Sequence, residues 1–152
     1  MYDVSKLKTI DECRTVMDRA KKLGKTDIYK IVFQRLCQLH GTLNEDPDDT
    51  LIKEFWETLG AYEQLLSEKN GRKTSASRTR QKIKNKGVIQ SLIDWTKSKS
   101  ETPGFIQLIN EGMPQYTGEY IVVKYASRFP PDVVQSAKAR LDQHNVEWPE
   151  EQ

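Results

Sequence analysis

Residues 51–66 read LIKEFWETLGAYEQLL, and this stretch decides the fold that we predict for the 152-residue chain. Its apolar side chains recur every three or four residues, a spacing that places them on one face of an α-helix. A helix with so broad an apolar face needs neighbours on several sides. We therefore predict that it is the central helix of an all-α bundle. The residues of this face are Leu51, Ile52, Phe55, Trp56, Leu59, Tyr62, Leu65 and Leu66.

Helical patterns also precede this stretch. Thr9 and Glu12 form a capping box in front of an apolar periodicity, and Gly24 ends that first helix. A second periodic segment follows almost at once. Because two helices joined by so short a turn pack side by side, we predict an antiparallel helix pair within residues 1–41.

The region after residue 100 is expected to be helical as well. Thr102 and Pro131 stand at two helix starts, while residues 119–125, EYIVVKY, have the composition of a strand. However, Thr117 before Gly118 is typical of a helix N-terminus, and the sequence offers no partner strand. A lone strand cannot pair its own backbone groups, so we predict a helix at 119–125.

The length fits one domain. We predict a compact bundle of about seven short helices over residues 1–145, with a frayed tail at 146–152. Within the bundle, the antiparallel pair of residues 1–41 precedes a central, a basic and a supporting helix in residues 48–100, and C-terminal helices occupy 101–145. The composition, 36% apolar and 30% charged, indicates a thin core with many exposed faces.

The two cysteines give information about the cellular compartment. Cys13 and Cys37 both fall on amphipathic helical patterns, where cysteine acts as a small apolar residue, so we expect buried thiols. The sequence shows no apolar run typical of a signal peptide and none approaching a membrane span. We therefore expect a cytoplasmic protein without a membrane partner.

Charge is strongly segregated along the chain. From Lys69 to Lys99 there are ten cations against a single acid, Asp94, which is a net charge of +9. Since the whole chain carries +2, the remainder carries −7. Segregation of this size predicts an electropositive face, although a solvated, lysine-rich helix is the simpler interpretation.

The centre of this basic segment is predicted to be a helix at about 75–86, because no helix breaker occurs before Gly87. Arginine and lysine can bind phosphates, serine hydroxyls can assist at a helix start, and glutamine and asparagine can pair with adenine in the major groove. The predicted phosphate contacts are Arg72, Lys73, Ser75, Ser77, Arg78, Arg80, Lys82, Lys84 and Lys86, and the candidate base readers are Gln81 and Asn85.

In outline, residues 65–87 resemble a helix-turn-helix: a core helix leads through a turn into a short polar helix. The resemblance implies that the second helix enters the major groove of DNA. Arg80 stands where such helices carry an aliphatic residue, and the connection between Leu66 and Ser75 is longer than the usual three or four residues. No aromatic residue accompanies the cations of the basic helix, unlike in many RNA readers, so we expect duplex DNA.

One alternative is a non-enzymatic adaptor that docks on an acidic protein partner or forms a homodimer. Such an adaptor would bind its partner through exposed aromatic side chains. Core packing is the competing interpretation for these residues, and for Trp95 in particular. The candidate anchors are Trp95, Tyr116, Tyr120 and Tyr125.

A second alternative is an accessory or weak metal-dependent nuclease. Asp46, Asp48 and Asp49 could hold Mg²⁺, although acids at a helix start commonly serve as caps. His40 and His144 lie far apart, and neither belongs to a metal-ligand spacing. No catalytic motif occurs, so we predict no enzyme activity, catalytic residue, metal or cofactor.

Overall fold

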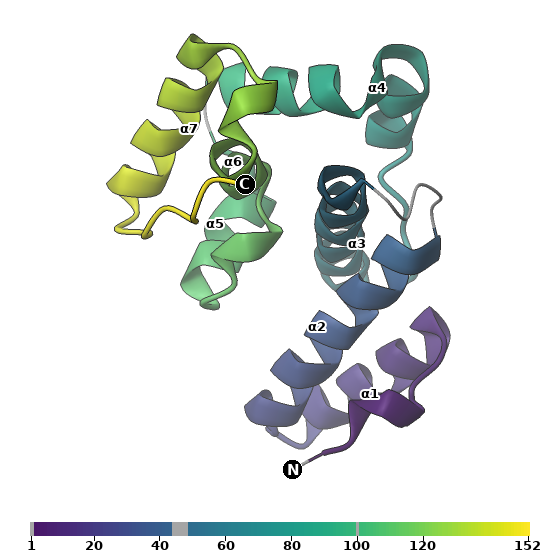
Figure 1. Cartoon of the computed structure of the whole chain (residues 1–152). Helices are drawn as coiled ribbons and strands as arrows, with labels where there is room; N and C mark the ends of the chain where they lie inside the picture. The colour runs from purple at the N-terminus through teal and green to yellow at the C-terminus, as the bar shows by residue number, and fades with distance from the viewer. Residues whose placement is uncertain (1, 44–48, 100) are drawn as a thin grey trace. The chain divides into compact units, whose positions relative to one another are not determined.

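The computed structural model describes residues 2–43, 49–99 and 101–152, and every regular element in these ranges is helical (Figure 1). The α-helices are α1 (Ile10–Lys22), α2 (Thr26–Leu43), α3 (Thr50–Asn70), α4 (Ser77–Lys97), α5 (Pro103–Asn110), α6 (Gly118–Lys124) and α7 (Pro131–Gln143). Three short 3₁₀ turns cover Val4–Lys6, Pro114–Tyr116 and Ala126–Arg128. The predicted all-α fold with about seven helices is confirmed. In these ranges no helix has both the length and the apolar character needed to cross a bilayer.

The helix starts follow the capping residues in the sequence. The hydroxyl of Thr9 accepts a hydrogen bond from the N–H of Glu12 at 3.1 Å, and Thr102 caps α5 in the same way. At α6, the hydroxyl of Thr117 accepts from the N–H of Tyr120 at 3.2 Å. The ambiguous segment 119–125 is therefore helical up to residue 124, as predicted, because a local cap outweighs its strand-like composition.

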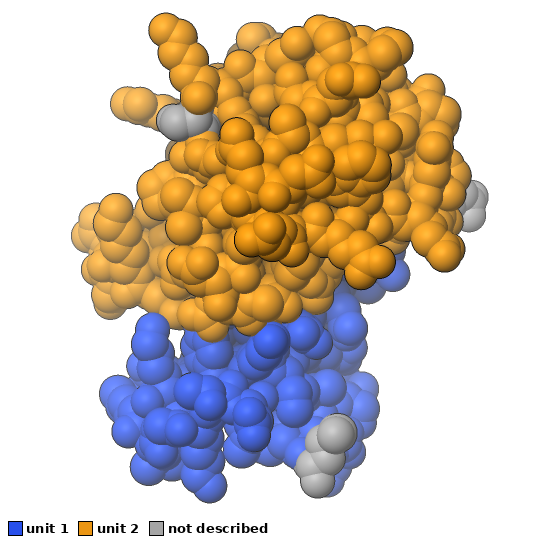
Figure 2. All heavy atoms as spheres, turned by 90° about the vertical axis from the view of Figure 1, so that its left-hand side faces the viewer, with its two compact units in different colours: residues 1–61 blue, residues 62–152 orange. Residues whose placement is uncertain are grey.

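The chain forms two compact units, Met1–Ala61 and Tyr62–Gln152, which Figure 2 shows in separate colours. The sequence predicted one helical domain over residues 1–145. The boundary falls inside α3, which has 21 residues and is therefore about 30 Å long. Residues 50–61 of α3 therefore belong to the N-terminal unit and residues 62–70 to the C-terminal unit.

In the N-terminal unit, α1 and α2 pack side by side (Figure 1). Met17, Phe33 and Phe55 are among the fully buried side chains of this core. Cys13 and Cys37 are buried as well, and neither forms a disulfide with a described residue. Burial raises the pKa of both thiols, which makes them poor nucleophiles.

The helices α2 and α3 approach closely within this same unit. α2 continues to Leu43, so His40 lies within its last turn and is buried. Gly60 of α3 faces its ring, and a Cβ added to Gly60 would lie 2.4 Å from Cδ2 of His40. The imidazole therefore occupies the space that a larger residue at position 60 would need.

The C-terminal unit is built around α4, α6 and α7. Leu92, Ile121 and Leu141 are fully buried there, and Gly118 allows α6 to approach the ring of Trp95. The tail 146–152, which we expected to fray, is not helical. The N–H of Gln152 donates to the C=O of Lys124 at 2.7 Å, and the ammonium group of Lys138 lies 4.6 Å from the ring centroid of Trp148.

Candidate nucleic-acid interface

The helix α4 is interrupted at Gly87, as the sequence predicted. Gly87 has φ 86° and ψ 170°, a backbone conformation accessible almost only to glycine. It separates a polar, basic part, residues 77–86, from an apolar part, residues 88–97. The hydroxyl of Ser91 donates to the C=O of Gly87 at 2.8 Å and holds the kink.

Within the C-terminal unit, the basic part of α4 buries only a narrow strip of its surface. Ile83 is buried, while Ala76, Thr79 and Arg80 are half-buried. The remaining predicted site residues are exposed, and we call this set the basic surface. It consists of Arg72, Lys73, Ser75, Ser77, Arg78, Gln81, Lys82, Lys84, Asn85 and Lys86.

The amides occupy the middle of this exposed side. Nε2 of Gln81 donates to Oδ1 of Asn85 at 3.4 Å, so the two side chains share one face. At 3.6 residues per turn, Arg78 falls beside them and opposite the buried Ile83. Lys84 then lies on one flank and Lys82 on the other. Two amides and an arginine are thus bordered by lysines on both sides.

Asp94, the single acid between Lys69 and Lys99, lies beyond the kink. Its carboxylate accepts hydrogen bonds from Nε2 of Gln90 at 3.0 Å and from Nζ of Lys86 at 3.4 Å. The bond from Gln90, and after it the charge of Lys86, lowers the pKa of Asp94. An ion pair this exposed contributes little to stability, so a phosphate can compete for Lys86.

Arg80 differs from the other predicted phosphate contacts. Its Nε donates to Oε2 of Glu63 and its Nη2 to Oε1, each at 2.7 Å. The Glu63 side chain is 4% exposed and that of Arg80 41%. The sequence pattern did not predict a role for Glu63. The available signal was an acid at position 63 inside the apolar stripe of α3, between Leu59 and Leu66.

The connection between α3 and α4 is tied back to α3. The hydroxyl of Ser67 accepts a hydrogen bond from the N–H of Thr74 at 2.8 Å. Gly71, with φ 70°, ends α3, and the N–H of Arg72 donates to the C=O of Ser67 at 3.1 Å. Residues 71–76 form a longer connection than a helix-turn-helix uses, and the proposed resemblance to that motif stays a prediction.

Two of the other candidate residues, Asp49 and His144, have structural partners. Oδ1 of Asp49 accepts from the N–H groups of Leu51 at 3.1 Å and Ile52 at 3.4 Å, and so caps α3. Asp46 and Asp48 lie outside the described residues. Nε2 of His144 lies 3.2 Å from Oε1 of Glu101, whereas His40 is in the N-terminal unit. In the described part of the chain, no three His, Cys, Asp or Glu side chains are grouped closely enough to hold a metal ion.

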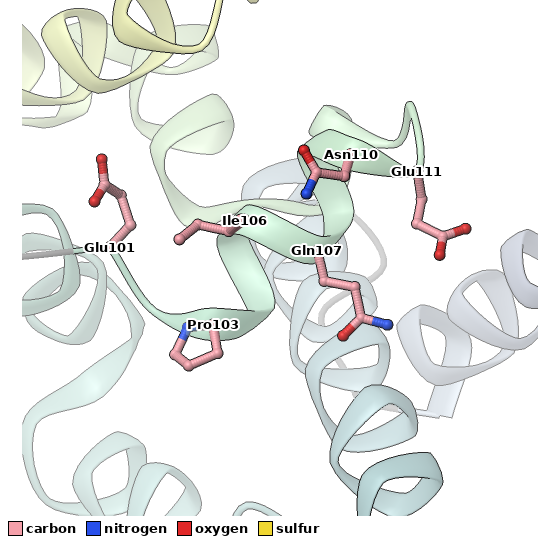
Figure 3. Close-up of a pocket in the computed structure, with 6 residues that line it drawn as sticks. All are labelled: Glu101, Pro103, Ile106, Gln107, Asn110 and Glu111. Carbon is pink, nitrogen blue, oxygen red and sulfur yellow. The ribbon is translucent and has the colours of Figure 1, made fainter.

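A shallow hollow of about 500 Å³ lies along α5 (Figure 3). It brings together two carboxylates and two amides around Ile106, which is 41% exposed. This set includes neither a nucleophile with a nearby base nor a cation that would hold an anion. The hollow therefore does not suggest a reaction. Its lining residues are Glu101, Pro103, Ile106, Gln107, Asn110 and Glu111.

No protein-family model matches this chain, and neither a curated protein nor a solved structure matches it. Inference about its function therefore rests on the chemistry of its own residues. Among the sites described above, the basic surface concentrates the most charge.

Proposed function

We propose that this chain binds nucleic acid, and duplex DNA in particular, through the basic surface. The observation that carries the proposal is the arrangement on the exposed side of α4, where Gln81 and Asn85 lie side by side between flanking cations. Amides can read base edges while the cations on either side contact the phosphates. A surface that served only solubility would not need amides placed between two rows of cations.

The charges themselves favour a polyanionic partner. Arg78 and Lys82, and likewise Lys82 and Lys86, are four residues apart on one helix. Each such like-charged pair destabilises an isolated helix by about 0.2–0.5 kcal/mol. A phosphate backbone removes this repulsion, because it places negative charge between the cations.

The proposed phosphate contacts are the exposed cations of the basic surface, and Arg80 is not one of them because it is paired with the buried Glu63. Contacts from six cations correspond to a slope of about −5 in a plot of log affinity against log salt concentration. They are Arg72, Lys73, Arg78, Lys82, Lys84 and Lys86.

The burial of aromatic residues supports this choice over the adaptor alternative. Tyr116 and Tyr125 are buried, and Trp95 and Tyr120 are half-buried. The ring of Trp95 lies 5.5 Å from that of Tyr62 and packs within the C-terminal unit. Aromatic side chains engaged in a core are not the anchors that a protein interface requires. The buried thiols also suit a reducing compartment such as the cytoplasm.

The proposal is tested by fluorescence anisotropy with a labelled random-sequence duplex at about 50 and about 200 mM salt. Wild type is compared with the pair Arg78→Gln, Lys82→Gln. The matched control pair is Lys8→Gln, Lys25→Gln, which removes two exposed cations from the N-terminal unit.

We expect the affinity of the wild type to fall by about 10³-fold between the two salt concentrations. The first pair should lose about two units of the log–log slope, and the control pair should keep the full slope. Failure of the wild type to bind at the lower salt concentration would exclude the proposal. An acidic protein partner would then be the next candidate for this surface.

A further inference from the structure

We infer that Glu63 is a positioning residue for the basic surface. In this view its carboxylate fixes the start of α4, and Arg80 serves as the anchor on that helix and does not contact phosphate. The inference rests on the proposed function for its link to binding. The hydrogen bonds on which it rests are present in the free chain, without any nucleic acid.

The carboxylate of Glu63 holds two separate groups of the α4 start. Both of its oxygens accept from the guanidinium of Arg80, at 2.7 Å each, and Oε2 also accepts from the N–H of Ala76 at 2.8 Å. Two parallel N–H···O bonds between arginine and carboxylate define both distance and orientation. Three hydrogen bonds to one buried side chain thus fix one end of the helix in position and direction.

The α4 helix does not cap itself. Ala76 is its N-cap residue, and in the described structure no side-chain hydrogen bond from this residue closes the first turn. The free N–H groups and the positive end of the helix dipole favour a nearby anion, which Glu63 provides from α3. Ser67, one turn further along α3, holds the N–H of Thr74. α3 therefore fixes both the connection and the first turn.

This anchoring determines which side of the helix faces outward. With Ala76 and Arg80 held toward α3 and Ile83 buried, the side carrying Gln81 and Asn85 must face solvent. Loss of the anchor would let the basic part of α4 turn or fray. The amides and cations would then no longer keep the register that a groove requires.

Arg80 is unsuited to phosphate binding for the same reason. Its withdrawal would leave the buried Glu63 carboxylate without its cation, and an unpaired buried charge is strongly destabilising. The hydrogen bonds with Glu63 also raise the pKa of Arg80. The guanidinium thus acts on binding through the position of the helix.

The test compares Arg80→Gln with Arg78→Gln, which is the same substitution two residues away on the exposed side. The double variant Glu63→Gln, Arg80→Gln restores a neutral, hydrogen-bonding pair. Duplex binding is measured over a range of salt concentrations for all three and for wild type. If Arg80→Gln does not fold, the double variant supports the same comparison with Arg78→Gln.

We expect Arg78→Gln to reduce the log–log salt slope by about one unit. Arg80→Gln should leave the slope unchanged but weaken binding by about tenfold, the scale of one charge-assisted hydrogen bond. The double variant should recover most of that loss. A slope reduced by about one unit in Arg80→Gln or in the double variant would show that Arg80 contacts phosphate, and would overturn the inference.

Hydrogen exchange of the free protein separates this inference from the proposed function. In Glu63→Gln, the amides of residues 76–80 should exchange about tenfold faster than in wild type, because the first turn loses its charged partner. Unchanged exchange there would refute the anchoring role. If the wild type binds no duplex but the exchange rises as expected, the proposed function fails and the anchor stands.

Discussion

The carboxylate of Glu119 and the guanidinium of Arg140 form an ion pair inside the C-terminal unit, with Oε2 and Nη1 2.9 Å apart. Their side chains are only 6% and 12% exposed. Nη1 of Arg140 also donates to the C=O of Trp95 at 3.1 Å, and Nη2 donates to the C=O of Ser98. One guanidinium thus connects α6 and α7 to the end of α4. Burial raises the pKa of Glu119, and the bond from Arg140 opposes that shift.

We predict that Arg140→Met lowers the free energy of unfolding by about 3–5 kcal/mol at about pH 7, because it leaves Glu119 buried without a cation. Because the pKa of Glu119 is raised in the folded state, its contribution to stability is largest below the unfolded pKa of about 4.3, where the carboxyl group is protonated in both states. This contribution is lost as the pH rises through the folded pKa. The penalty of the variant should therefore shrink toward about pH 4.5. Urea unfolding at both pH values tests this, with Lys99→Met as the control for an exposed cation. An equal penalty at both pH values would contradict it.

Gly60→Ala should destabilise the N-terminal unit even though alanine is the better helix former. The added Cβ would lie 2.4 Å from the imidazole of His40, and overpacking of this kind costs about 1–3 kcal/mol. In a His40→Ala background, where the ring is absent, the same substitution should be neutral or stabilising. Thermal unfolding of the four proteins of this double-mutant cycle measures the coupling. Additive effects of the two substitutions would show that the two helices are not in this close contact.

Gly87→Ala should destabilise the chain by about 1–3 kcal/mol through backbone strain alone. Apart from the adjoining residues and the nearby backbone of α4 itself, no atom lies within 4 Å of the position that a Cβ would take, so a clash with the surrounding structure does not contribute. Gly71→Asn is the matched control: Gly71 has φ 70° and open space around it, and asparagine tolerates the left-handed region. Chemical unfolding should show a clearly smaller loss for Gly71→Asn. Equal stability of Gly87→Ala and wild type would mean that α4 can continue without its kink.

Ser77→Glu should change stability and binding in opposite directions. A carboxylate in the first turn of α4 interacts favourably with the helix dipole, worth about 0.3–1 kcal/mol. The same charge stands in the basic surface and should weaken binding to duplex DNA. Thermal unfolding and anisotropy on one preparation measure both, with Ala139→Glu on the exposed side of α7 as the control. Undiminished DNA binding by Ser77→Glu would place the interface elsewhere.

Gln81→Ala and Asn85→Ala should relax the preference among duplex sequences. One bidentate contact to adenine discriminates against the wrong base by about 1–3 kcal/mol. Lys84→Gln, a phosphate contact in the proposal, should instead weaken binding to every sequence alike. Selection from a random duplex pool, followed by competition binding, distinguishes these outcomes. If the two amide variants select the same sites as wild type with equal preference, the amides are not base readers.

Local features of the sequence were sufficient to predict most of the helices. Thr9 and Thr117 cap helices through hydrogen bonds to N–H groups three residues ahead, so their effect is visible in a short window. Gly87 interrupts α4 where the sequence pattern indicated a break. Leu23 falls at the same helical spacing as the apolar residues before it, yet it is 63% exposed, because it is the C-cap residue that follows α1.

The sequence was sufficient to predict the charge of the candidate site, because charge follows from residue type. It also predicted which side of the helix is exposed, because that follows from the spacing of the apolar residues. The partner of Arg80 was not, since Glu63 lies 17 residues away and belongs to a different helix. An arginine in a basic run has the same sequence signal whether it meets a phosphate or a buried carboxylate. Only the packing of α4 on α3 shows that Arg80 pairs with a buried carboxylate.

The sequence by itself therefore determined that the chain is helical, where most helices begin, and that its positive charge is concentrated between residues 69 and 99. Interactions within a few residues of each other set those properties. The tertiary structure decided the division of the chain within α3, the pairing of Glu63 with Arg80, and the pairing of Glu119 with Arg140. These depend on which helices pack together, because a buried charge selects its partner by proximity in space and not by spacing along the chain.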